Sequence, residues 1–159
     1  MVVCRLFQAV DLSMKFSVHI PFVEHLGFAL TKFEDGEAEI TYTAQPEHLN
    51  SFNVVHGGAT MTLLDVCMAH AARSVELEMG AVTIEMKTSF MQATLPLATG
   101  PLVAKARLIH RTATMAFTEG TVYDAKGRAC SHSTGTFKYV KRLPTSSSSV
   151  QNLNGISTD

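Results

Sequence analysis

Apolar and polar residues alternate along residues 33–44, the pattern of a strand with one buried face. The apolar positions are Ala38, Ile40, Tyr42 and Ala44, and the polar positions between them are Glu37, Glu39, Thr41 and Thr43. Successive side chains of a strand point to opposite sides of a sheet, so a period of two predicts a half-buried strand. Before it, a short apolar segment from Pro21 stops at Gly27, which predicts a short amphipathic helix.

The segment from Ala59 to about Val75 contains neither proline nor interior glycine and is apolar or small at almost every position. A helix that is apolar on all sides is normally buried on all sides. Apart from small hydroxyl residues, only Asp65, His70 and Arg73 interrupt this pattern. We therefore predict a long buried helix that carries very few charges.

Four further strands are predicted after Gly80, over residues 81–94, 102–110, 113–124 and 128–140. They are separated by a proline-bounded segment at 96–101, a turn at 110–112, and the hairpin signal DAKG at 124–127. A short helix, a strand, a long buried helix and a four-stranded meander fit one architecture. We predict the α+β class, with an antiparallel sheet wrapped around a long central helix.

The 159 residues suffice for one domain with a real core. We place this domain at residues 21–143, after an N-terminal extension of residues 1–20. Residues 144–159 are polar, serine-rich and without periodicity, which predicts a disordered tail. Hydrophobic residues make up 46% and charged residues 17% of the chain, a thin polar surface that favours a homo-oligomer.

Thirteen Lys and Arg residues against fourteen Asp and Glu residues give a formal charge of −1, without the basic excess of a nucleic-acid binder. The three cysteines show no spacing typical of a metal site or a disulfide framework, which favours a reducing compartment. No apolar run approaches the ~20 residues of a membrane helix, and no signal peptide is evident. We predict a cytoplasmic protein with no metal, no nucleic-acid partner and no membrane partner.

Asp65 is the charge that the predicted central helix makes conspicuous. Because an unpaired buried carboxylate is costly, such a group is either ion-paired, for example with Arg73, or placed in a cleft as a base or nucleophile. His56-Gly57-Gly58 stands at the start of this helix, where backbone N–H groups are unpaired and partly positive. Two glycines leave these groups accessible to a substrate carbonyl oxygen, although a tight turn would also need glycine.

The spacing of these two features favours a site shared between two copies of the chain. Asp65 lies seven residues after Gly58, roughly 10 Å along a helix. One water molecule would hardly touch both this carboxylate and a carbonyl held at the helix start. The distance is no obstacle if one subunit supplies the helix start and the other supplies the carboxylate.

The segment from Asn50 to Asp65, NSFNVVHGGATMTLLD, closely resembles the signature of hotdog-fold acyl-CoA thioesterases. The nearest group is the phenylacetate-degradation (PaaI-like) type of the 4HBT thioesterase superfamily, and the resemblance runs from about Pro21 to Val140. It implies a hotdog fold, a homodimer with shared active sites that usually pairs again as a homotetramer, and an acyl-CoA substrate without a separate cofactor. Asn53 stands where many relatives have glycine; we expect the loop to survive, since asparagine tolerates left-handed backbone.

The resemblance also implies a role for each residue of the motif. The Gly57 backbone N–H would polarise the thioester carbonyl, with Asn50 helping to hold it and His56 orienting the loop. Asp65 of the facing subunit would activate or align the attacking water, assisted by a hydroxyl on the next strand, here Thr83. Direct attack by Asp65, through a transient anhydride, is the alternative route that the sequence leaves open.

Coenzyme A carries phosphate groups, so cations are expected near the mouth of the site. Arg111, Lys138 and Lys87 are the candidates, together with Gly58 at the helix start. Each cation taken singly is more simply a solvated surface charge. The acyl group can be aromatic or a short or medium aliphatic chain, because the candidate lining residues do not separate these classes.

Three other functional interpretations of the sequence are possible. Cys67 and His70 could form a nucleophilic pair, although a cysteine in an apolar helix is usually structural. Asp65 and His70 match the spacing of hotdog hydratases, but five residues of continuous helix turn the two side chains ~140° apart. A hotdog module that binds acyl-CoA without hydrolysing it is the non-enzymatic alternative; Asp65 and Asn50 argue against it, because such binders have often lost the helix carboxylate.

Overall fold

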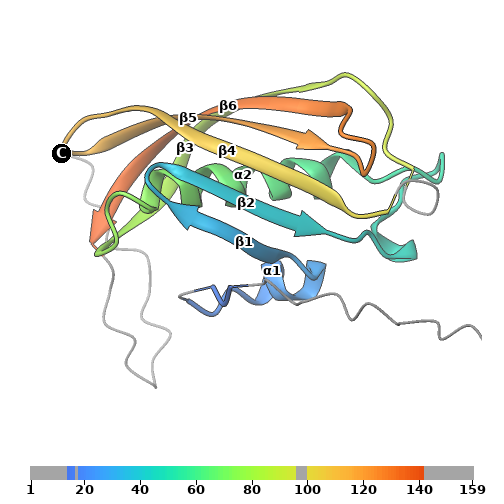
Figure 1. Ribbon diagram of the computed structural model, residues 1–159, viewed down its shortest axis with the longest axis horizontal. Helices are drawn as coiled ribbons and strands as arrows, with labels where there is room; N and C mark the ends of the chain where they lie inside the picture. Colours follow the sequence, from blue (N-terminus) through green and yellow to red (C-terminus); the bar gives the residue numbers. More distant parts are fainter. Residues whose placement is uncertain (1–13, 17, 96–99, 142–159) are drawn as a thin grey trace, which may run out of the picture.

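A computed structural model of the chain describes residues 14–16, 18–95 and 100–141 (Figure 1). The predicted disordered tail and most of the predicted N-terminal extension lie outside these residues. The helices and strands are, in chain order, α1 (Pro21–Leu26), β1 (Ala29–Glu34), β2 (Glu37–Tyr42), the 3₁₀ helix η1 (Pro46–His48), α2 (Gly57–Arg73), β3 (Met79–Phe90), β4 (Leu102–Arg111), β5 (Met115–Tyr123) and β6 (Ala129–Lys141).

The six strands form one antiparallel sheet in the order β1-β2-β4-β5-β6-β3. The sheet curves over α2, and α1 lies below β1 at one edge (Figure 1). The predicted α+β class and the sheet wrapped around a long central helix are confirmed. No helix in the described ranges is long and apolar enough to cross a membrane.

The single strand predicted at residues 33–44 is wrong, because this region is a hairpin of β1 and β2. The turn is Asp35-Gly36, and both residues have positive φ, 49° and 81°. Asp-Gly is a strong turn signal, since both positions of a tight hairpin turn favour left-handed backbone. The alternation that carried the prediction belongs to β2 alone, where Ala38, Ile40 and Tyr42 are buried.

The predicted four-stranded meander is also wrong in one respect. β4, β5 and β6 pair consecutively, but β3 pairs with β6 at the far edge and not with β4. The reason is that α2 spans the sheet and delivers the chain to its far edge, so the connection after β3 returns β4 to a place beside β2. Periodicity predicts strands but not which strands are neighbours.

α2 is enclosed as its apolar composition predicts. Leu63, Leu64, Cys67 and Met68 have no exposed surface. The sheet approaches Met68 so closely that a Cβ placed on Gly120 would lie 3.1 Å from the Met68 side chain. This close packing fixes the helix against the sheet, and with it the positions of the polar groups that the helix carries.

Candidate active site

The start of α2 presents backbone N–H groups to its surroundings. His56 is the N-cap residue, and its Nδ1 accepts a hydrogen bond of 2.9 Å from the Gly58 N–H. A Cβ on Gly58 would lie 3.0 Å from that nitrogen, so glycine permits this cap. The Gly57 N–H has no acceptor among the described residues. The helix therefore begins with a free donor at its partly positive end.

Asn50 lies in the loop before α2 and is oriented by that loop. Its Oδ1 accepts hydrogen bonds from the backbone N–H groups of Phe52, at 2.9 Å, and Val54, at 3.3 Å. Because the amide oxygen is fixed by two donors, the Nδ2 group remains as a donor. Asn53 has a φ of 56°, the left-handed conformation that the sequence predicts it can tolerate.

Asn50 and Gly57 line the same pocket, which has a volume of about 320 Å³. Phe90 at the end of β3 forms one wall, with its ring next to Gly57: a Cβ on Gly57 would lie 3.4 Å from the Phe90 Cζ. The other lining residues come from the loop before α2, from α2, from the segment after β3 and from β6; they are Val54, Val55, Thr60, Met91, Gln92, Ala93, Thr94 and Ser131. The two predicted carbonyl-binding groups therefore share one hollow.

Asp65 lies farther along α2, where the helix faces β3. Its Oδ1 accepts a hydrogen bond of 2.6 Å from the Thr83 hydroxyl. Burial raises the pKa of Asp65 above the usual value, and the Thr83 hydrogen bond offsets part of this rise. Asp65 is half-buried and has no ion-pair partner in the described part of the chain. The alternative of an ordinary ion pair with Arg73 has no support here, and Thr83 lies where the resemblance implied.

The two halves of the predicted site are separate within one chain. Asp65 does not line the pocket that holds Asn50 and Gly57. It lies eight residues after Gly57, about 12 Å along the helix axis. A single chain thus offers a carbonyl-binding pocket and a distant carboxylate.

The three predicted cations lie away from this pocket. Arg111 forms an ion pair of 2.6 Å with Glu76, beyond the C-terminal end of α2. Lys138 follows the buried Phe137 and is exposed, so it points to the outer face of the sheet. Lys87 is opposite Thr134 on the same outer face. The structure therefore does not bring these cations together with Gly57.

Neither alternative pair that involves His70 fits the structure: Asp65 and His70 face opposite edges of the sheet, and the thiol of Cys67 is enclosed. The His70 ring contacts Phe33 of β1, with centroids 5.7 Å apart, whereas Asp65 contacts Thr83 of β3, and β1 and β3 are opposite edges of the sheet. Cys67 is fully buried and its pKa is raised by that burial. Neither a hydratase pair nor an activated cysteine fits this geometry.

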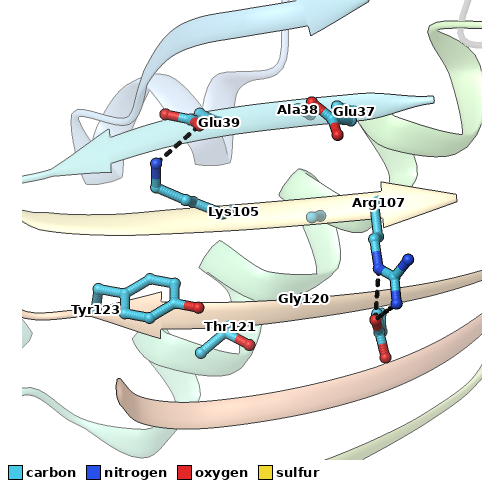
Figure 2. A pocket seen from close by; sticks show the side chains of 10 residues that line it. Glu37, Ala38, Glu39, Lys105, Arg107, Gly120, Thr121 and Tyr123 are labelled. Carbon is cyan, nitrogen blue, oxygen red and sulfur yellow. Dashed lines mark hydrogen bonds and ion pairs between the residues drawn. The ribbon is translucent and has the colours of Figure 1, made fainter. Parts of the chain in front are cut away.

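A second hollow, of about 240 Å³, lies on the outer face of β2, β4 and β5 (Figure 2). All its charged residues are ion-paired: Lys105 bonds to Glu39 at 2.9 Å, Arg107 bonds to Glu119 at 2.6 Å, and Glu37 pairs with Lys32 outside the hollow. Exposed pairs of this kind contribute little to stability and leave no charge to attract a ligand. No cluster of three or more His, Cys, Asp or Glu residues that could hold a metal ion is present in the described ranges.

Sequence reasoning missed the pocket walls. Thr60 could have been found, because it lies one helical turn after Gly57 and so faces the same side of α2. Thr94 and Ser131 carry no local signal, since Ser131 reaches the pocket through the pairing of β3 with β6 and Thr94 lies in the segment that follows β3. The hydrophobic pattern did not predict this pairing, because it does not specify which strands are neighbours.

Comparison with known proteins agrees with this fold. Residues 52–131 match the model of the thioesterase superfamily (4HBT). A protein of Thermoplasma acidophilum that is provisionally named an esterase is 23% identical over 137 residues, which cover 86% of this chain and 100% of that relative.

Two solved structures show the same fold. A conserved protein of Pseudomonas aeruginosa is 26% identical with a TM-score of 0.72, and the match covers 77% of this chain and 95% of that one. The PaaI protein from the phenylacetic acid degradation operon of E. coli is 21% identical with a TM-score of 0.69, covering 75% of this chain and 83% of that one. With a central helix inside a six-stranded antiparallel sheet and this family match, the chain is a hotdog-fold hydrolase of the thioesterase superfamily.

Proposed function

We propose that the protein is an acyl-CoA thioesterase that hydrolyses an aromatic or a short- or medium-chain acyl-CoA to the free acid and coenzyme A. The observation that carries this proposal is the free Gly57 N–H at the start of α2, which lies beside Asn50 in one pocket. The helix start and the Asn50 Nδ2 group would both donate to the thioester carbonyl oxygen. Donors that are already in place where negative charge develops stabilise an oxyanion.

Asp65 would align or deprotonate the attacking water. Burial raises its pKa, which makes it a stronger base than an ordinary carboxylate, and the Thr83 hydroxyl donates a hydrogen bond that stabilises its charged form. Direct attack by Asp65 on the carbonyl is the competing route. Single-turnover hydrolysis in ¹⁸O-labelled water separates the routes. Label in the Asp65 carboxylate after one turnover requires an anhydride that water opens at the Asp65 carboxyl carbon, whereas direct attack by water places the label in the free acid.

We further infer that two copies pair along β3 to complete each site. Thr83 and Phe90 lie seven residues apart on this strand, roughly 23 Å. If two β3 edges pair antiparallel around a twofold axis near residues 86–87, Thr83 of one copy stands beside Phe90 of the other. Asp65, which is bonded to Thr83, would then face Gly57, which lies against Phe90. This arrangement supports a homodimer with shared sites; a homotetramer and a cytoplasmic location stay predictions.

The first test compares the wild type with Asp65→Asn on acyl-CoAs of graded chain length together with phenylacetyl-CoA and benzoyl-CoA, by following free thiol release. We expect Asp65→Asn to lose at least ~10²-fold in activity, the scale of one catalytic group. Asp35→Asn is the matched control, since Asp35 lies in an exposed turn where asparagine also suits the positive φ. Acyl-CoA binding without turnover by the wild type would favour the non-catalytic binding module instead.

The shared site is tested by complementation. A heterodimer of one Asn50→Ala chain and one Asp65→Asn chain contains one site with both defects and one with neither. If the site is shared, the purified heterodimer recovers about half of the wild-type activity, because one of two symmetric sites is intact, and an equimolar mixture that pairs at random recovers about a quarter. A site contained in one chain predicts no recovery above the parent variants.

A further inference from the structure

The pocket beside Gly57 is lined by three hydroxyl residues that are almost completely buried. Thr60 is 3% exposed, Thr94 is 6% exposed and Ser131 is 1% exposed. They come from α2, from the segment after β3 and from β6, so the hydroxyl groups surround the pocket from separate elements. Within the described ranges, none of the three hydroxyl groups has a hydrogen-bond partner in the protein.

Each of these hydroxyl groups keeps some accessible surface, and the pocket is the hollow that its residue lines. They do not belong to the fully enclosed polar atoms without a partner, a group that includes the Tyr42 hydroxyl. A hydroxyl that is withdrawn from water without a partner is costly, so each of the three favours a ligand oxygen or a water molecule as its partner. A purely hydrocarbon ligand would displace water and leave these groups unpaired.

The charge and size of the pocket further restrict the class of ligand that fits. No lining residue is ionisable, so the pocket offers no cation for a second carboxylate and favours a neutral oxygen. The volume of about 320 Å³ equals roughly ten water volumes, which suits a short acyl group. Thr60 lies three residues after Gly57, so its side chain stands only ~5–6 Å from the position where the carbonyl is held.

We propose that this pocket selects short acyl groups that carry a neutral oxygen substituent close to the thioester, as in a short hydroxyacyl-CoA, and that Thr60, Thr94 and Ser131 are the specificity-determining residues. This inference rests on the proposed thioesterase function, because it takes the Gly57 N–H as the place where the thioester carbonyl binds. The oxygen of the substituent exchanges hydrogen bonds with the three hydroxyl groups.

The test uses three acyl-CoAs with four-carbon acyl chains: butyryl-CoA, 3-hydroxybutyryl-CoA as each enantiomer, and succinyl-CoA. Affinity is measured by calorimetry on the Asp65→Asn variant, and kcat/KM is measured on the wild type. We expect 3-hydroxybutyryl-CoA to be preferred over butyryl-CoA by about tenfold or more, and succinyl-CoA to be the poorest of the three. Thr60→Val and Ser131→Ala should each reduce the hydroxyacyl preference at least ~5-fold.

Matched controls are available on the same elements. The Thr62 hydroxyl donates to the Gly58 carbonyl oxygen at 2.9 Å, and the Ser133 hydroxyl to the Lys87 carbonyl oxygen at 2.9 Å. Neither residue lines the pocket, so Thr62→Val and Ser133→Ala should leave the preference unchanged. Thr60→Ser, which keeps the hydroxyl, should restore most of it.

Two results would overturn the inference. Equal affinity for the hydroxyacyl and unsubstituted thioesters would mean that the hydroxyl groups bind only water. An equal loss of affinity for all thioesters and for free coenzyme A in the variants would mean that they contact the pantetheine arm. Failure of the proposed function gives a different result, because the wild type would then hydrolyse none of the three acyl-CoAs. The ratio of the affinities of Asp65→Asn for 3-hydroxybutyryl-CoA and butyryl-CoA would still test the specificity.

Discussion

The two edges of the sheet differ in how the chain protects them. β1 is six residues long, and the segment before α1 bonds to it, with the Met14 N–H donating to the Leu30 carbonyl at 2.6 Å. β3 is twelve residues long and pairs, in the described part of the chain, with β6 alone. It exposes apolar side chains, with Ile84 57% and Phe90 56% exposed.

The helix that spans the sheet directs His70 toward the β1 edge and Asp65 toward the β3 edge. At the β1 edge His70 is 3% exposed, and Phe16 and Phe33 enclose its ring. At the β3 edge Asp65 is only half-buried, and its Thr83 partner is exposed. A long apolar edge invites pairing with another chain. The closed edge thus supports the fold, whereas the open edge carries the carboxylate and the exposed apolar surface on which the proposed shared site depends.

The largest expected effect comes from placing a charge on the open edge. Ile84→Glu should cost the single chain little, because the residue is exposed, but it would bury a carboxylate in the proposed dimer. We expect dissociation and an activity loss of about 10²-fold, since each site loses the partner's Asp65. Analytical ultracentrifugation and thiol release measure the two effects.

Ile109→Glu is the matched control for this charge, because Ile109 is 54% exposed on β4, away from the edge. It should leave both mass and activity unchanged. A monomeric Ile84→Glu protein with full activity would show that one chain holds a complete site.

The next effect concerns the closed edge. His70→Leu removes the hydrogen bond of 2.8 Å between Nδ1 and the Val66 carbonyl oxygen and the ring contacts with Phe16 and Phe33. We expect a loss of about 1–3 kcal/mol in the free energy of unfolding, with kcat/KM nearly unchanged. Denaturant titration and steady-state kinetics measure these. A large drop in kcat at unchanged stability would instead give His70 a role in the reaction.

The contrast between the edges also marks what the sequence could predict. Local signals were sufficient for α2, for its start at His56-Gly57-Gly58 and for the isolated charge of Asp65, because these depend on helix periodicity and on N-terminal geometry. The Asp35-Gly36 turn carried such a signal too, but the alternation of β2 concealed it. In each case the information lies within a few residues.

The open edge itself could not be predicted. Its position depends on β3 pairing with β6, a long-range choice that periodicity does not contain. The same pairing brings Phe90 and Ser131 to the pocket, so the polar part of the pocket wall, at Ser131, could not be predicted either. The resemblance indicated the residues of the motif, but not the residues proposed to select the acyl group.

A smaller effect is expected from Thr83, which supports Asp65 at the open edge. Its hydroxyl lowers the pKa of Asp65 against the effect of burial. Thr83→Val removes this effect, so the acid limb of the kcat/KM profile should move to higher pH, with up to about tenfold lower activity at the plateau. Thr83→Ser keeps the donor and should keep the wild-type profile. An unchanged pH profile in Thr83→Val would mean that the Thr83 hydroxyl does not affect the group that titrates.

The smallest effect is on stability, and it has the opposite sign from the effect on activity. Burial raises the pKa of Asp65 above its unfolded value, so the charged form is disfavoured in the folded protein. The Asp65 carboxyl therefore contributes favourably to the free energy of unfolding below its unfolded pKa. This contribution is lost as the pH rises through its folded pKa. At neutral pH, Asp65→Asn should therefore be more stable than the wild type by up to ~3 °C in Tm, the shift that about 1 kcal/mol gives for a chain of this size.

This gain should shrink as the pH falls through the folded pKa toward the unfolded value of ~3.9, because the wild-type carboxyl becomes protonated in the folded state. Asp35→Asn, at the exposed turn of the closed edge, should show no such pH-dependent gain. Thermal melts from pH 4 to pH 8 at one protein concentration measure the difference, because oligomer stability depends on concentration. A variant that is less stable than the wild type at neutral pH would mean that the Asp65 carboxylate stabilises the fold. Its half-buried position would then have a structural role and would not destabilise the protein in favour of catalysis.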